Sequence, residues 1–138
     1  MLIPAAVLVF WTMIMLVWMF VDRTRNYSRV KFSIADAPPG ARGQDLAQRL
    51  PPGSDWPAHN YVHLLEQPTV FYAACVILAL SEPTSYDHLL AWGYVAVRIV
   101  HSIWQAKVNT VPVRAGLFMV STMFMFLLAI RALLATLG

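Results

Sequence analysis

The stretch NYVHLLEQPTVFYAACVILAL, residues 60–80, has a polar beginning and an apolar end. Its 21 residues match the length of about 20 that a helix needs to cross a bilayer, and no charge follows Thr69. The first two turns carry His63, Glu66 and Gln67, although a charged group inside lipid costs about 2.5–3.5 kcal/mol. The stretch therefore predicts a membrane-spanning helix with a polar site near one end.

Pro68 divides this stretch and predicts a kink in the helix. A proline has no backbone N–H, so it cannot donate a hydrogen bond to the carbonyl of Leu64. That acceptor then needs a partner from a neighbouring helix, a water or a ligand.

Three further apolar segments predict spans at about residues 1–21, 89–106 and 115–137. The alternative for the first, a cleavable signal peptide, lacks a basic beginning and an A-x-A pattern, and we expect the segment to be retained. The chain is 59% hydrophobic and 12% charged, which excludes an ordinary water-soluble domain. We predict an all-α integral membrane protein, a four-transmembrane-helix bundle in which residues 1–138 form one domain.

Basic residues predict the orientation of this bundle. A long loop, residues 22–58, and the loop between the third and fourth spans together hold eight of the ten Lys and Arg residues. The loop between the second and third spans holds Glu82 and Asp87 and no basic residue. The positive-inside rule then places the long loop in the cytoplasm and both termini outside, as in a multi-pass protein of a bacterial inner membrane. This distribution along loops, and not on one polar face, also argues against a nucleic-acid partner.

Smaller features fit the same arrangement. Trp56 and Trp104 should mark the inner membrane interface and Trp92 the outer one. Within the long loop, GQDLAQRL predicts two helical turns in which Asp45 and Arg49 pair at i and i+4. The single cysteine, Cys75, excludes an intrachain disulfide.

Two polar stripes converge near the cytoplasmic side. On the third span four polar residues are separated by 4, 3 and 4 positions, which places them on one face of the helix: Tyr94, Arg98, His101 and Gln105. The second span contributes Asn60, His63 and Gln67. Similar depths predict that Glu66 and Arg98 meet as an ion pair, which either locks two helices together or serves a function.

Three other kinds of site involve these polar residues: an anion site, a metal site and a proton relay. Arg114 stands where the fourth helix begins, where its cation serves either as a membrane anchor or, with free helix amides, as an anion site. A metal site of His63, Glu66 and His101 is disfavoured because the sequence lacks H-E-x-x-H and a paired Glu-x-x-His, so we expect no metal. A proton relay is disfavoured because one short stripe does not cross the membrane.

These segments together resemble the MAPEG family, the membrane-associated proteins of eicosanoid and glutathione metabolism. The resemblance covers nearly the whole chain and rests on the long first loop and on three motifs: NYVHLLEQPTVFY (60–72), RIVHS (98–102) and NTVPVR (109–114). It implies a homotrimer in which glutathione lies between neighbouring subunits near the cytoplasmic face.

The resemblance also implies roles for individual residues. Glu66 matches a glutamate that contacts glutathione and the helix-three arginine, which is Arg98 here. His101 matches a histidine that contacts glutathione, and His63 lies among these cofactor-binding positions. Arg114 matches the arginine that holds the thiolate and is the expected catalytic residue, because a nearby cation favours the reactive anion of a thiol.

The sequence departs from catalytic members at several positions. Val62 and His63 stand where those members carry Arg-Asn, and the other differing positions are Gln105, Ala115 and Phe118. Two functions follow: a glutathione-dependent transferase or peroxidase acting on lipophilic electrophiles, or a non-catalytic scaffold that keeps the fold and serves a membrane-protein partner.

Overall fold

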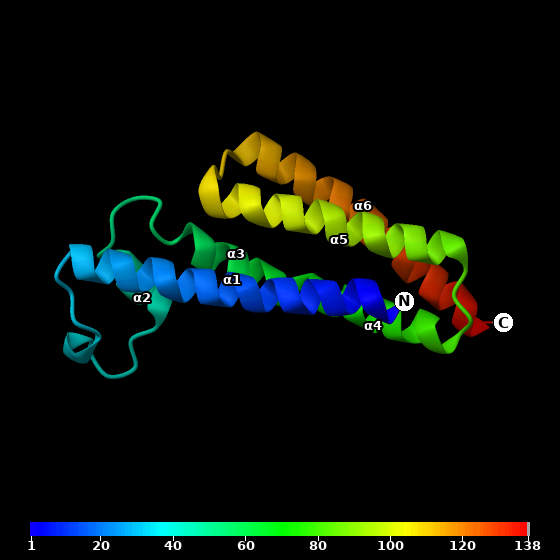
Figure 1. The fold of residues 1–138 in the computed structure, drawn as a ribbon, viewed down its shortest axis with the longest axis horizontal. Helices are drawn as coiled ribbons and strands as arrows, with labels where there is room; N and C mark the ends of the chain where they lie inside the picture. The colour runs from blue at the N-terminus through cyan, green and yellow to red at the C-terminus, as the bar shows by residue number, and fades with distance from the viewer. Residues whose placement is uncertain (138) are drawn as a thin grey trace.

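The computed structural model describes residues 1–137, which form helices joined by loops (Figure 1). The elements are α1 (Leu2–Arg29), the 3-10 turn η1 (Ile34–Asp36), α2 (Gly43–Ala47), α3 (Trp56–Glu66), α4 (Pro68–Leu80), α5 (Ser85–Lys107) and α6 (Val111–Leu137). The described residues contain no strand, which confirms the all-α prediction. The four long rods, α1, α3–α4, α5 and α6, run in alternating directions, so that both termini lie at one end and the η1–α2 loop at the other (Figure 1).

Three of these rods are long and apolar enough to cross a membrane: α1, the continuous run Trp56–Leu80, and α6. Large apolar side chains cover their outer faces; Phe10 on α1 and Phe126 on α6 are each more than 60% exposed. A helix that is apolar on all sides suits lipid better than water. By the same measure α5 is too polar, because its inward face carries the charged and amide groups described below.

Helix α1 is longer than predicted, since it continues past the expected end at residue 21 to Arg29. Asp22 and Arg23 end the apolar segment but not the helix, and the Asp22 carboxylate accepts a hydrogen bond from Asn26 Nδ2 (3.1 Å), one turn later. The residues past the expected end, 22–29, form an extension of α1, and the long loop therefore begins at residue 30 instead of 22.

An ion pair between Arg23 and Asp55 joins the extension of α1 to the end of the long loop. Arg23 donates from Nε to Asp55 Oδ1 (3.0 Å), and Asp55 is buried. The predicted helix within the loop is present as α2, but the predicted Asp45–Arg49 pair is wrong: Asp45 instead accepts from the backbone N–H of Arg42 (2.9 Å) at the beginning of the helix. That hydrogen bond lowers the pKa of Asp45 below its ordinary value of 3.8.

At Pro68, where we predicted a kink, the second rod is divided into two helices, because α3 ends at Glu66 and α4 begins at Pro68. The intervening Gln67 keeps helical dihedral angles (φ −59°, ψ −39°), so α4 continues in nearly the direction of α3 (Figure 1). Gln67 Nε2 donates to Thr122 Oγ1 (2.8 Å), which ties the interruption to α6.

The core lies where the four rods meet. Phe71 of α4 stacks on Tyr94 of α5 with ring centroids 4.5 Å apart, and both are fully buried. Helices α5 and α6 approach closely at Gly93, where an added Cβ would lie 2.7 Å from the ring of Phe124. This contact fixes α5 against α6, the two helices that carry most of the site.

Candidate functional site

An open pocket of about 260 Å³ lies between α3, α5 and the beginning of α6. Six residues line it: His63, His101, Arg114, Ala115, Phe118 and Met119. Three of the five residues expected from the sequence therefore come together: His63, His101 and Arg114. They contribute two imidazoles and one guanidinium to a wall that is otherwise apolar.

Arg114 reaches the pocket from the first turn of α6. Its Nη1 donates to Asn109 Oδ1 (2.7 Å), and its backbone N–H donates to the Thr110 carbonyl (3.1 Å). That amide is already bonded and Pro112 has no N–H, so neither is free to bind a ligand, whereas the guanidinium carries a full positive charge at this helix end. The cation thus faces the pocket from a fixed position.

Asn109 is a site residue that the sequence analysis missed. It adopts a left-handed backbone conformation (φ 54°), which lets the chain turn from α5 into α6, and its N–H donates to the Trp104 carbonyl (2.8 Å). Asparagine tolerates this conformation better than most residues. Its position after the third span was the available signal, because Asn often follows a helix end.

The two histidines differ in their environments. His101 on α5 is almost completely buried, and its ring centroid lies 6.1 Å from that of Phe118. His63 on α3 is half-exposed, and its Nδ1 lies 3.2 Å from Glu66 Oε2. An exposed pair of this kind contributes at most about 1 kcal/mol to stability, so its value lies in orienting His63.

The predicted Glu66–Arg98 ion pair is wrong within the chain. Glu66 pairs with His63, and Arg98 Nη2 instead donates to the His63 backbone carbonyl (2.6 Å). The reason is rotation along α3: Glu66 follows buried Leu64 by two residues, about 200° around the helix, and so points away from α5. Neither Glu66 nor Arg98 belongs to the lining of the pocket.

The predicted polar face of the third span is confirmed, because α5 buries Tyr94, Arg98, His101 and Gln105 together. Ser102, which the sequence analysis did not single out, joins this face to its neighbours. Its Oγ accepts from Asn60 Nδ2 (2.6 Å) on α3 and from Trp11 Nε1 (3.0 Å) on α1. The inward face of α5 is thus a polar seam inside the bundle.

Metal ligation has no support among residues 1–137, which contain no cluster of three His, Cys, Asp or Glu side chains able to hold an ion.

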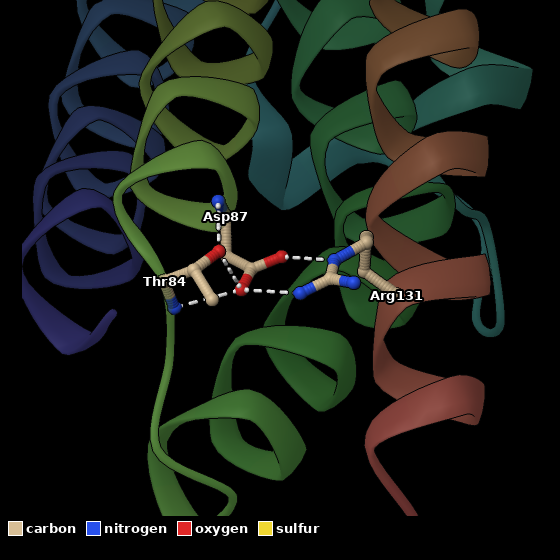
Figure 2. Close-up of polar contacts among 3 residues, drawn as sticks. All are labelled: Thr84, Asp87 and Arg131. Atoms are coloured by element: carbon tan, nitrogen blue, oxygen red, sulfur yellow. Dashed lines mark hydrogen bonds and ion pairs between the residues drawn. The ribbon is translucent and has the colours of Figure 1, made fainter.

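A second charged cluster, also missed, joins the beginning of α5 to the last turns of α6 (Figure 2). Arg131 of α6 donates to both oxygens of buried Asp87, from Nε to Oδ1 (2.8 Å) and from Nη2 to Oδ2 (3.3 Å). Thr84 donates to Asp87 Oδ2 from its N–H (2.8 Å) and its hydroxyl (2.7 Å), which caps the beginning of α5. The T-x-x-D spacing and the lone arginine near the end of the fourth span were the available signals.

No curated protein and no solved structure matches the chain. The family comparison does give a match, and it agrees with the helical architecture and the membrane-capable helices. The model of the MAPEG family matches residues 1–134 of the 138-residue chain, so this multi-pass membrane protein belongs to the MAPEG family.

Proposed function

We propose that the protein is a glutathione-dependent transferase or peroxidase that acts on lipophilic electrophiles. The observation that carries the proposal is the pocket in which Arg114, His63 and His101 converge at the beginning of α6. A fixed guanidinium favours the thiolate over the thiol, and the thiolate is the nucleophile in such reactions. Arg114 would hold that sulfur, and the reaction would take place at the membrane interface, where an apolar substrate arrives through the lipid.

The chemistry of the lining fits such a ligand. Glutathione carries carboxylates, amides and a thiol, which suit the cation and imidazole donors on one side of the pocket. His63, His101 and the neighbouring Glu66 would orient its peptide part, while Phe118 and Met119 would face the apolar substrate.

The proposal includes four membrane crossings and a homotrimer. α5 is long enough to cross, at 23 residues, and buries its polar face against α3 and α1, which leaves its outer face to lipid. The pocket is open on one side and Glu66 points outward, so a neighbouring subunit could complete the site. In this proposal the basic loop and the beginning of α3 lie in the cytoplasm and the termini lie outside, in a bacterial inner membrane; the positive-inside rule supports this orientation.

Calorimetry on the detergent-solubilised protein tests this function. We expect glutathione to bind at millimolar concentration or below, and Arg114→Ala to weaken binding at least tenfold, which corresponds to about 1.4 kcal/mol. Arg25→Ala, which removes an exposed arginine on the α1 extension, is the matched control and should bind as the wild type does. No binding to the wild type at millimolar glutathione would remove the proposal.

A specific observation favours the second candidate, a non-catalytic scaffold for a membrane-protein partner. Gln105 is buried in the seam and Phe118 places a phenyl ring in the pocket lining, so neither offers a hydroxyl to a ligand. The scaffold predicts that Glu66→Gln impairs assembly or partner association while wild-type protein shows no thiol-dependent turnover. Robust transferase activity of the wild type would exclude it.

A further inference from the structure

Arg98 is the most completely buried charged side chain near the pocket. It is 1% exposed, although it lies in the middle of α5. Its guanidinium makes two contacts: Nη2 donates to the His63 carbonyl (2.6 Å), and Cζ lies 5.7 Å from the centre of the Phe118 ring. The first contact reaches α3 and the second reaches α6.

This burial separates Arg98 from any ligand in the pocket. Nε and Nη1 are buried and have no hydrogen-bond partner among the described residues, and the pocket lining does not include Arg98. Phe118, by contrast, both lines the pocket and contacts the guanidinium. The arginine therefore lies outside the pocket lining, while the two residues that it contacts, His63 and Phe118, both belong to that lining.

The position of the hydrogen bond gives it a mechanical effect. His63 lies in the last turn of α3, directly before the interruption where Pro68 leaves the Leu64 carbonyl without its helical donor. The hydrogen bond from Arg98 joins α5 to α3 one residue before Leu64, at His63, next to the bond by which Gln67 joins this interruption to α6. On the other side Phe118 lies one turn after Arg114 on α6, so the ring contact holds the wall that carries the cation.

We propose that Arg98 is a positioning residue that sets the distance between the His63 wall and the Arg114 wall, without contacting the ligand. Its charge also contributes a fixed positive potential near the pocket, where the low dielectric of the bundle strengthens it. The effect of Arg98 on glutathione binding rests on the proposed function. The arrangement of His63 can nevertheless be tested in the protein without ligand.

The experiment combines a spectroscopic and a kinetic measurement on full-length protein in nanodiscs. Ring-labelled histidine reports the signal of His63, assigned through His63→Gln, and glutathione turnover gives KM and kcat. Arg98→Met keeps much of the side-chain volume and removes the hydrogen bond and the charge, whereas Arg98→Lys keeps the charge. Arg131→Met is the matched control, because it removes an arginine about 25 Å along α6 from Arg114.

We expect the His63 signal to move in Arg98→Met and, by less, in Arg98→Lys, but not in Arg131→Met. KM for glutathione should rise about tenfold in Arg98→Met with kcat changed less than threefold, and Arg98→Lys should recover part of the loss. If Arg98→Met does not fold, Arg98→Lys carries the test. An unmoved His63 signal in a folded Arg98 variant would overturn the proposal, whereas absent glutathione binding by the wild type would overturn the proposed function and leave the His63 result standing.

Discussion

The close approach of α5 and α6 at Gly93 gives a quantitative prediction for Gly93→Ala. The new Cβ would lie 2.7, 2.9 and 3.0 Å from three ring atoms of Phe124, and real Cβ contacts are not this short. Phe124 packs against the core, so its ring cannot move away freely. Overpacking of this kind costs about 1–3 kcal/mol.

The gain from replacing glycine within a helix offsets part of this cost. Alanine in a helix is more stable than glycine by about 0.5–1 kcal/mol, so the net loss in the free energy of unfolding should be about 0–2.5 kcal/mol. Gly116→Ala is the matched control, because an added Cβ there meets nothing within 4 Å. It should stabilise the protein by about 0.5–1 kcal/mol.

Reversible unfolding in mixed micelles, followed by circular dichroism, measures both changes. Phe124→Leu in the Gly93→Ala background should restore part of the lost stability, since the shorter side chain removes the close contact, and a double-mutant cycle isolates that coupling. Equal stabilisation by Gly93→Ala and Gly116→Ala would refute the reasoning, because it would mean that α5 and α6 do not pack as closely as described.

Three further predictions concern other parts of the molecule. Asp87→Asn removes the charge that Arg131 contacts at the end remote from the pocket, so it should lower the thermal midpoint while glutathione affinity, measured by calorimetry, stays unchanged. Asn109→Gly keeps the left-handed turn but loses the hydrogen bond to Arg114, so affinity should fall severalfold at unchanged stability; equal losses in both would contradict this role. The pKa of Asp45 is lowered in the folded protein, so its support of α2 is present above the ordinary value of 3.8 and is lost as the pH falls below it; the protection factors of the α2 amides, which compare observed with intrinsic exchange rates at the same pH, should fall there and not at neutral pH.

Periodicity and apolar length were sufficient to predict the helices and the buried face of α5. Long apolar segments have few alternatives in lipid, and the polar residues of α5 face the bundle interior, as expected for costly groups within such a segment. The ends were less predictable: α1 continues to Arg29 because charged residues outside the membrane do not end a helix. The α3–α4 interruption followed directly from Pro68, whose missing N–H has a local effect.

Ion pairs between side chains of different helices could not be predicted from the sequence. Similar depths along two antiparallel helices suggested that Glu66 meets Arg98. Depth does not fix the rotation of a helix about its axis, however, and Glu66, two residues after buried Leu64, points away from α5. The Asp87–Arg131 pair was not predicted because its partners lie 44 residues apart in the sequence. They can be identified as partners only when α5 and α6 are known to pack side by side.

The central claim is that a thiol ligand binds where Arg114, His63 and His101 converge. Cryo-electron microscopy of the protein in nanodiscs, with millimolar glutathione, tests it most directly. We expect density for the ligand beside the Arg114 guanidinium, at a boundary between subunits, and its loss in Arg114→Ala. A well-resolved map with no density in this pocket, or with glutathione bound elsewhere, would contradict the claim.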